Sequence, residues 1–265
     1  MIGLALGLPK MGKTQVLQDY VGAHALANRF FVIDRTNDWT SDSHRWRGIK
    51  WKEWTQRIAR VAHFAGISTL PLTTDRPWFA NAPAPDGDLE SWAKRLPATG
   101  VFRFPWPWEG IDVAQLAVDI GNVTFVDDEI DFTALNEGWK SNPLRMVCHR
   151  GRHLPNRDGV MGQVHILGAA RRAQNMALDL TTLADFVWVF RLRGHRTLER
   201  LVHDSLLLPE ELDRVRALPR THFRFWTVDG ETSWGQSTPY AHADPDPPSD
   251  ARPDELEAPE LDEDD

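Results

Sequence analysis

Cysteine is nearly absent from this sequence of 265 residues, which contains only Cys148. A single cysteine cannot form an internal disulfide and cannot build the usual cysteine-rich zinc site, so both are excluded. We expect Cys148 to be a small core side chain rather than a nucleophile. The lack of cysteine fits a reducing, cytoplasmic setting.

Long apolar runs and a targeting leader are also lacking. No stretch of about 18 consecutive apolar residues occurs, and a membrane-spanning helix needs roughly that length. The chain enters an apolar run at Ile2, without the basic region and cleavage site of a signal peptide. We therefore expect a cytoplasmic protein with neither a signal peptide nor a transmembrane segment.

Positive charge is scarce only in the last part of the sequence. The formal net charge is -8, but residues 241–265 alone hold 11 Asp or Glu and one Arg. The remaining residues hold 29 basic and 27 acidic side chains, which is close to neutral. We expect the acidic, proline-rich segment 241–265 to be a disordered tail. It could serve solubility, or it could mimic nucleic acid and compete for the protein's own basic surface.

The most informative motif is a phosphate-binding loop near the N-terminus. Its pattern is G-x-x-x-x-G-K-T, and its residues are Gly7, Leu8, Pro9, Lys10, Met11, Gly12, Lys13 and Thr14. An apolar run, Ile2–Leu6, precedes the motif, and a helix-compatible stretch, Thr14–Ala27, follows it. In such a loop the backbone N–H groups surround the phosphates at a helix N-terminus. We expect Lys13 to reach the β- and γ-phosphates of ATP and the Thr14 hydroxyl to coordinate Mg²⁺.

Apolar runs of strand length alternate with helix-period segments along the chain. The runs are Ile2–Leu6, Phe30–Asp34, Val101–Phe104, Val123–Val126, Val164–Ala170 and Phe186–Arg191. Helices are predicted at Asp112–Ile120 and Asn175–Leu183, and a late strand, Phe223–Val228, at the edge of the sheet. This alternation predicts an α/β fold with a mostly parallel central sheet flanked by helices, over residues 1–240.

Residues 38–100 fit this alternation poorly, and we interpret them as an insertion between the second and third strands. The interval is rich in tryptophan, with Trp39, Trp46, Trp51, Trp54, Trp78 and Trp92. These side chains could stack on the bases of a single strand. They could also pack in a small satellite core or a subunit interface, where large aromatic residues are common.

Three consecutive acidic residues, Asp127, Asp128 and Glu129, follow the apolar run Val123–Val126. ATP hydrolysis needs a carboxylate that holds Mg²⁺ and a base that orients the attacking water. If the strand ends at Val126, Asp127 serves the metal and Asp128 the water. If the strand extends by one residue, the pair becomes Asp128 and Glu129, because side chains alternate along a strand. We favour Asp127 for Mg²⁺, with Asp128 or Glu129 as the base.

Two arginine groups complete the candidate site. Arg171 and Arg172 follow the run Val164–Ala170, and ligands of parallel sheets bind at the carboxyl ends of strands. Either arginine could stabilise transition-state charge, within its own subunit or a neighbouring one, or the pair could face DNA. Arg150 and Arg152 lie in the most basic segment, 145–157, and are candidates for phosphate contacts with DNA.

These motifs together resemble the FtsK–HerA superfamily of DNA-pumping ATPases. The matching segments are GLPKMGKT, FFVIDRTNDW, VTFVDDEID, CHRGRH, HILGAARRAQN and FVWVFRL, over about residues 1–37 and 100–229. The family usually has a polar sensor at the tip of the fifth strand, where this sequence has Ala169 and Ala170. Arg171 or Gln174 is the candidate to replace it. The tryptophan-rich interval matches nothing in the family.

The resemblance implies a RecA-like P-loop ATPase that translocates double-stranded DNA without reading its sequence. The small size looks most like the genome-packaging ATPases of tailless, membrane-containing viruses. This implies ATP and Mg²⁺ as cofactors, a homo-oligomeric ring, and partners at a capsid vertex or in a viral membrane. The expected location is the host cytoplasm, with possible association with the virion. The alternatives are a Zot-like phage assembly ATPase or a nucleotide-gated scaffold; a small-molecule kinase is disfavoured because no acceptor pocket or lid is evident.

Overall fold

The structure is a computed structural model that describes residues 1–25, 27–36, 38–39, 79–82, 92, 96–135, 137–151 and 153–237. Most of the tryptophan-rich interval and the whole acidic tail therefore lie outside the described residues, as does Arg152. The predicted boundaries at residues 38–100 and 241–265 remain predictions. No helix in the described part of the chain is long and apolar enough to cross a membrane.

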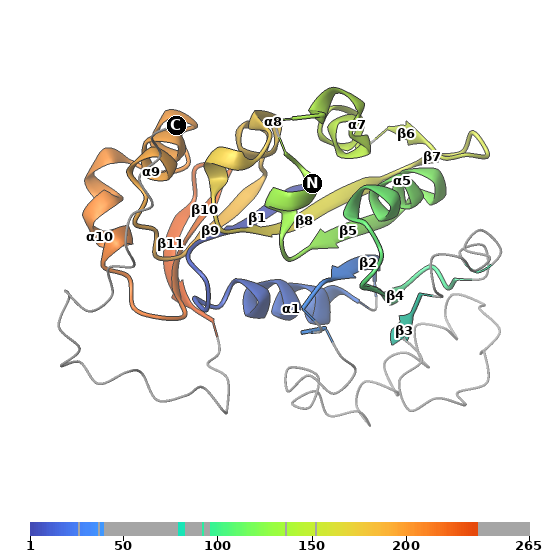
Figure 1. Ribbon diagram of the computed structural model, residues 1–265, viewed down its shortest axis with the longest axis horizontal. Coiled ribbons are helices and arrows are strands. Elements are labelled where there is room, and N and C mark those ends of the chain that lie inside the picture. The colour runs from blue at the N-terminus through green and yellow to red at the C-terminus, as the bar shows by residue number, and fades with distance from the viewer. Residues whose placement is uncertain are drawn as a thin grey trace, which may run out of the picture.

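A twisted sheet forms the centre of the molecule (Figure 1). Its strands, in order across the sheet, are β11 (Thr232–Gln236), β10 (His222–Thr227), β9 (Phe186–Val189), β1 (Ile2–Leu6), β8 (Val164–Ala170), β5 (Val123–Asp127), β2 (Arg29–Asp34), β4 (Gly100–Pro105) and β3 (Phe79–Asn81). From β9 to β3 all neighbours are parallel, while β10 and β11 are added antiparallel. The predicted fold class, a mostly parallel sheet flanked by helices, is confirmed.

Helices cover both faces of the sheet. In Figure 1, α1 (Lys13–His24) lies on one face, and α5 (Gly110–Ile120), α7 (Pro143–Arg150) and α8 (Leu178–Thr182) lie on the other. The remaining short elements are α6 (Ile130–Thr133), α9 (His195–His203), α10 (Leu212–Arg216), a hairpin of β6 (Leu154–Pro155) and β7 (Met161–Gly162), and the 3-10 turns η1 (Trp139–Ser141), η2 (Ala173–Asn175) and η3 (Pro209–Glu211).

Burial on both faces explains the continuous apolar runs in the sequence. Successive residues of a strand face opposite sides, so each central strand contributes to two cores. Ala5 of β1 packs with Val16 and Leu17 of α1. Its neighbours Leu4 and Leu6 pack in the second core, on the side of α5. All five residues of β1 are buried, which places the end of this strand in the middle of the molecule.

Several predicted boundaries need correction. The strand Phe223–Val228 is not at the edge, because β11 pairs with β10 outside it. The run Phe186–Arg191 forms a strand only to Val189, and helical structure in Asn175–Leu183 is limited to η2 and α8. Within the predicted insertion 38–100, residues Phe79–Asn81 form β3, a strand that we did not predict and that pairs in parallel with β4. A strand of three residues is too short to stand out by its periodicity.

Candidate nucleotide-binding site

The phosphate loop leaves the end of β1 between its neighbours β8 and β9. The Gly7 N–H donates to the Ala170 carbonyl at 3.2 Å, and the Leu8 N–H donates to the Arg191 carbonyl at 3.0 Å. A Cβ atom on Gly7 would lie 2.6 Å from the Phe190 Cβ, closer than real side chains come. Glycine is therefore required where the loop passes this buried ring.

The loop ends at Gly12, which caps α1 in the left-handed conformation with φ +101°. Glycine adopts this conformation without the penalty that a Cβ brings. Gly12 has no side chain that could accept a hydrogen bond from the first turn of α1. Free N–H groups at the start of a helix, together with the helix dipole, favour a bound phosphate. The second glycine of the motif thus sets up the anion-binding end of α1.

Lys13 is buried inside the loop and donates to two of its carbonyls. Its Nζ lies 2.8 Å from the Gly7 oxygen and 2.9 Å from the Leu8 oxygen. Burial lowers the pKa of Lys13 to about 8, against the opposing effect of the nearby Asp128 carboxylate. A phosphate in the loop would add negative charge and raise this pKa again. The ammonium group is therefore positioned for anion binding.

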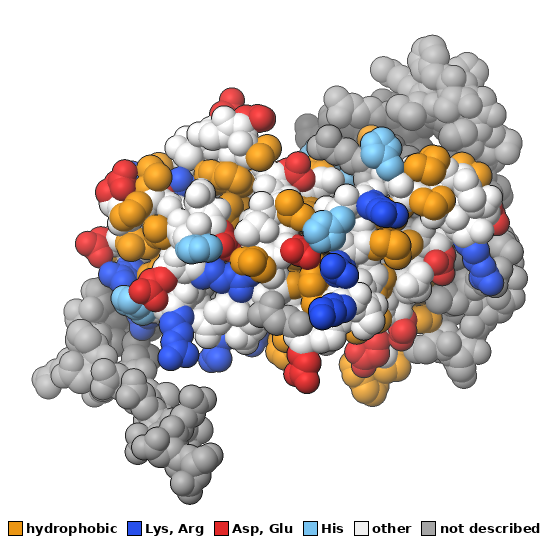
Figure 2. Space-filling view, turned by 90° about the horizontal axis from the view of Figure 1, so that it is seen from above, with side chains coloured by type: hydrophobic (Ala, Val, Ile, Leu, Met, Phe, Trp, Pro, Cys, Tyr) orange, Lys and Arg blue, Asp and Glu red, His pale blue; other side chains and the backbone are white. Residues whose placement is uncertain are grey.

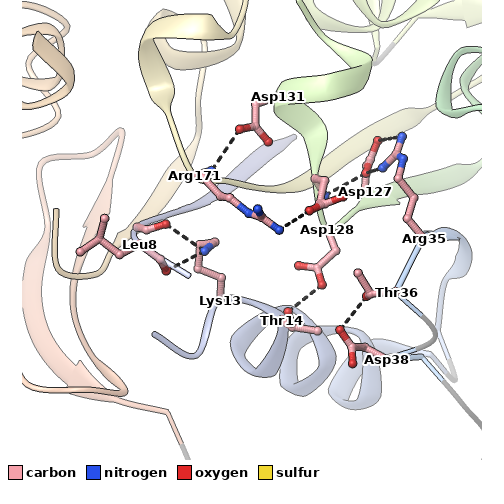
Figure 3. A network of polar contacts seen from close by, with 12 residues as sticks. Leu8, Lys13, Thr14, Arg35, Thr36, Asp38, Asp127, Asp128, Asp131 and Arg171 are labelled. Carbon is pink, nitrogen blue, oxygen red and sulfur yellow. Dashed lines mark hydrogen bonds and ion pairs between the residues drawn. The ribbon is translucent and has the colours of Figure 1, made fainter. Parts of the chain in front are cut away.

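Thr14 and Asp128 meet directly across the site. The Thr14 hydroxyl donates to Asp128 Oδ2 at 2.6 Å, joining the first turn of α1 to the residue after β5 (Figure 3). The second oxygen, Oδ1, is buried and has no hydrogen-bond partner. Burial raises the pKa of Asp128 to about 7, while the bond from Thr14 and the charge of Lys13 oppose this rise.

This pair has the donor chemistry of a magnesium site. Mg²⁺ prefers hard oxygen ligands and usually binds through one or two carboxylates, water and phosphate oxygens. The Thr14 hydroxyl and the unpartnered Oδ1 of Asp128 are such ligands, and the two side chains are in direct contact. A nearby dication would also remove the cause of the raised Asp128 pKa, since it stabilises the ionised carboxylate. The residues present therefore fit Mg²⁺.

Asp127, which we favoured for Mg²⁺ from the sequence, lies apart from the contact between Thr14 and Asp128. The strand includes Asp127, and this side chain is fully buried. Both of its oxygens accept hydrogen bonds from Arg35, and Oδ2 also accepts one from Thr133. Asp127 thus links the end of β2 to α6 through Arg35 and Thr133. Its hydrogen bonds do not include Thr14. The alternative register, with Asp128 facing the loop and Glu129 next to it, is the one in the structure.

Glu129 and Arg171 form an ion pair from the ends of β5 and β8. The Arg171 backbone N–H also donates to Asp131 Oδ2 at 3.2 Å, which fixes where the arginine leaves the strand. Half of the Arg171 side chain is exposed, whereas Glu129 is 17% exposed. The candidate base and the candidate charge-stabilising arginine therefore already contact each other within one chain.

The other predicted arginines are not part of this cluster. Arg172 is exposed at the start of η2. Arg150 is exposed at the end of α7, on the face of the sheet opposite α1. Arg152 lies outside the described residues. The DNA-contact roles of Arg150 and Arg152 remain predictions.

Two further charged residues lie at the end of β2. From the sequence we expected an acid, Asp34, at the end of this strand but gave it no role, and we gave none to Arg35. Arg35, the residue after β2, clamps Asp127 and also donates to the Thr133 hydroxyl at 2.8 Å. Asp34 accepts from the buried Arg103 of β4 and from the N–H groups of Asp38 and Trp39. Asp34 is the last residue of β2 and Arg35 follows it, and this position at the end of a parallel strand was the available signal.

Cys148 is half-buried in α7, and burial raises the pKa of its thiol to about 12. The thiolate is the reactive form, so this cysteine is unreactive at neutral pH. The expectation that Cys148 is not a nucleophile agrees with this environment.

Because the pKa of Asp128 is raised, the free energy of unfolding should depend on pH. The variant Asp128→Asn, whose side chain does not titrate, should lack this dependence. The folded form keeps a proton on Asp128 up to about pH 7, whereas the unfolded carboxyl loses it near 3.8. Stability from this group therefore falls as pH rises between those values, by up to about 1.4 kcal/mol per pH unit. Urea unfolding of the parent and Asp128→Asn, without nucleotide, should show the variant gaining relative stability from pH 4 to 7. A constant difference across this range would contradict the assigned burial.

Comparisons with known proteins agree with this arrangement at the level of fold. No protein-family model and no curated protein matches the sequence. Among solved structures, the genome-packaging NTPase B204 from Sulfolobus turreted icosahedral virus 2, in complex with sulfate, matches with a TM-score of 0.57 and 13% identity, over 89% of this chain and 96% of that one. VirB4 of Thermoanaerobacter pseudethanolicus matches with a TM-score of 0.52 and 11% identity, over 91% and 90%. B204 has also been crystallised with ATP-gammaS.

The fold is that of a P-loop ATPase. Its structural similarity is to the genome-packaging NTPase B204 and to VirB4, at low sequence identity. Each match covers about nine tenths or more of both chains. The similarity therefore extends over the central sheet and its helices and is not limited to the phosphate loop.

Proposed function

We propose that this chain hydrolyses ATP to translocate double-stranded DNA, and that its task is to package a viral genome into a preformed capsid. The observation that carries the enzymatic part is the contact between Thr14 and Asp128 beside the buried Lys13. The DNA part is supported by similarity to B204 of Sulfolobus turreted icosahedral virus, described as a DNA-packaging ATPase, with a TM-score of 0.51.

Each residue of the site has a distinct part in the proposed reaction. The N–H groups of residues 7–14 bind the phosphates, and Lys13 contacts the β- and γ-phosphates. Thr14 and Asp128 hold Mg²⁺, which when bound neutralises charge on the phosphate oxygens. Glu129 orients the attacking water. Asp127 and Arg35 position the turn that carries Asp128 and Glu129.

Release of Glu129 from Arg171 is the first step of this proposal. The ion pair engages Oε1 of Glu129, one of the two carboxylate oxygens that could accept a hydrogen bond from water. The γ-phosphate of ATP competes for the same guanidinium, since arginine binds phosphate oxygens well. Transfer of Arg171 from Glu129 to the phosphate would therefore free the base when ATP is in place.

The proposed assembly is a homo-oligomeric ring around DNA. Exposed Arg172 lies near the site and is available to a neighbouring subunit, while exposed Arg150 is available to DNA. On the face that carries α7 and α8, Lys and Arg side chains are interspersed with Asp, Glu, His and apolar side chains (Figure 2). Phosphate contacts need positive charge without base-specific geometry, which suits transport of any sequence. Partners at the capsid vertex or in a viral membrane, and location in the host cytoplasm or virion, belong to this proposal.

A second candidate is an assembly or export ATPase, including a Zot-like factor, that uses nucleotide as a switch. The nucleotide site supports this candidate, because the contacts of Lys13, Thr14 and Asp128 provide for nucleotide without any requirement for DNA. In this case ATP binding changes the conformation of the chain, and duplex DNA is not a substrate.

Duplex DNA should distinguish the two candidates. For a translocase, we expect duplex DNA to raise the steady-state rate of ATP hydrolysis, because the motor works only on its track. DNA affinity should fall steeply with salt, with a slope set by the number of phosphates contacted. The test measures hydrolysis and DNA binding over a salt series, with duplexes of unrelated sequence as the control. Hydrolysis that duplex DNA does not change would support the switch and contradict the translocase.

A further inference from the structure

Three basic side chains from distant parts of the chain surround the tip of the phosphate loop. We call Lys10, Arg191 and Arg220 the basic collar. Arg220 Nε donates to the Lys10 carbonyl at 3.0 Å, and Arg191 Nη2 lies 3.7 Å from the Met11 sulfur. Lys10 is itself exposed at the tip, in the left-handed conformation with φ 61°. The fold therefore gathers three positive charges at residues 10 and 11 of the loop.

The collar has no acidic partner within the described residues. None of its three side chains forms an ion pair there, although Arg35, Arg103, Arg171, Arg200 and Arg224 all do. In addition, the Nε of Arg191 is buried without a hydrogen-bond partner. A buried guanidinium N–H that lacks an acceptor is costly. Unpaired positive charge together with an unsatisfied donor is the signature of a site for an anion.

Ser237, the last described residue before the acidic segment, lies next to this collar. Ser237 is buried, and its N–H donates to the Thr221 carbonyl at 2.8 Å. The Thr221 N–H in turn donates to the Met11 carbonyl at 3.2 Å. A Cβ atom on Gly12 would lie only 2.8 Å from the Ser237 hydroxyl. Residue 237 is therefore held against the phosphate loop.

Chain length then keeps the acidic side chains near the collar. The first of them, Asp244, is seven residues after Ser237. An extended chain spans at most roughly 3.5 Å per residue, so Asp244 lies within about 25 Å of Ser237. The 11 acidic residues of 241–265 follow from there. A tether of this length gives an effective concentration on the order of millimolar at the collar.

We propose that the basic collar binds the acidic segment 241–265 of its own chain, and that the segment competes there with the phosphates of nucleotide and DNA. Each ion pair at such an exposed site is weak, and screening acts over about 8 Å at physiological salt. The bound state therefore depends on many weak contacts, and a densely charged competitor displaces it. The competition rests on the proposed function; the binding of the segment to the collar does not.

The binding is tested without any enzymatic assay. A fluorescent peptide of residues 241–265 is titrated into the full chain whose own acidic residues in 241–265 are replaced by Asn and Gln. We expect binding that weakens about tenfold in Lys10→Gln/Arg220→Gln, since each exposed pair contributes modestly. Arg145→Gln, exposed on α7 across the sheet, is the matched control and should bind the peptide as before. Arg220→Lys retains the charge and should retain most of the binding.

Equal binding of the peptide to the parent collar and the double variant, in proteins with unchanged thermal unfolding, would overturn the proposal. The proposal would also be overturned if the peptide did not bind the parent collar. If, in addition, the double variant lost affinity for duplex DNA, the collar would be assigned to DNA binding instead. A shuffled peptide of the same composition should bind equally if charge alone is recognised.

The competition has a separate readout. Neutralising the acidic segment in the full chain should lower KM for ATP about threefold at low ionic strength and leave kcat unchanged, with the difference disappearing at high salt. If the peptide binds the collar but the chain never hydrolyses ATP, the proposed function fails while the collar remains. If hydrolysis occurs with the same KM in both forms, the competition is wrong.

Discussion

Replacing Lys13 with alanine should reduce kcat for ATP hydrolysis by at least about 100-fold, as loss of one preorganised charge-stabilising donor does in other enzymes. The side chain donates to two loop carbonyls and is the buried cation of the site. The fold should survive, because the substitution removes a buried charge whose pKa is already lowered to about 8. Phosphate release under saturating MgATP measures the rate, and circular dichroism checks the fold.

Lys140→Ala is the matched control, since this lysine is exposed in η1 away from the loop. It should hydrolyse ATP at the parent rate. Parent-like hydrolysis by Lys13→Ala would mean that residues 7–14 are not the phosphate site, and the assignments of Thr14 and Asp128 would fall with it.

The second large effect is expected at Arg172. If this exposed arginine completes the site of a neighbouring subunit, Arg172→Gln should lower kcat by on the order of 10³-fold, as removal of an arginine finger does. ATP affinity should change little, because the contact forms mainly in the transition state. Mixing Arg172→Gln with Lys13→Ala should then restore part of the activity, since one subunit supplies the loop and the other the arginine.

Arg171 should behave differently in the same experiment. Its guanidinium pairs with Glu129 of its own chain, so Arg171→Gln should lose activity that Lys13→Ala subunits do not restore. Arg216→Gln, whose surface pair with Asp213 contributes little, is the control for loss of an arginine. Normal hydrolysis with weaker DNA binding in both variants would make these residues DNA contacts. A mixture that stays inactive at every ratio would contradict a trans role for Arg172 and direct the search to Arg150 and Arg152.

The central sheet could be predicted because its signal is local. The strands Ile2–Leu6 and Val164–Ala170 are buried except at His165, so each forms a largely apolar run with the observed boundaries. The phosphate loop could be predicted as well, because a strand-like run precedes its motif and a helix-like segment follows it. The similarity to B204 confirms the fold that these patterns predict.

The choice between Asp127 and Asp128 could not be made from the sequence. Both follow the same apolar run, and one residue decides which carboxylate faces the loop. The deciding partners are distant: Arg35 binds Asp127 from the end of β2, while Thr14 binds Asp128 from α1. Likewise, the basic collar joins residues 10, 191 and 220, and no local pattern connects them.

The most direct measurement of the central claim is ATP-dependent displacement of a third strand from a triplex placed on duplex DNA. A translocase moves along the duplex and removes the third strand, whereas a switch or a static DNA-binding protein does not. We predict displacement by the parent with MgATP, and none with a non-hydrolysable analogue or with Lys13→Ala. Hydrolysis by the parent without any displacement, on duplexes long enough to hold the protein beside the triplex, would contradict the account.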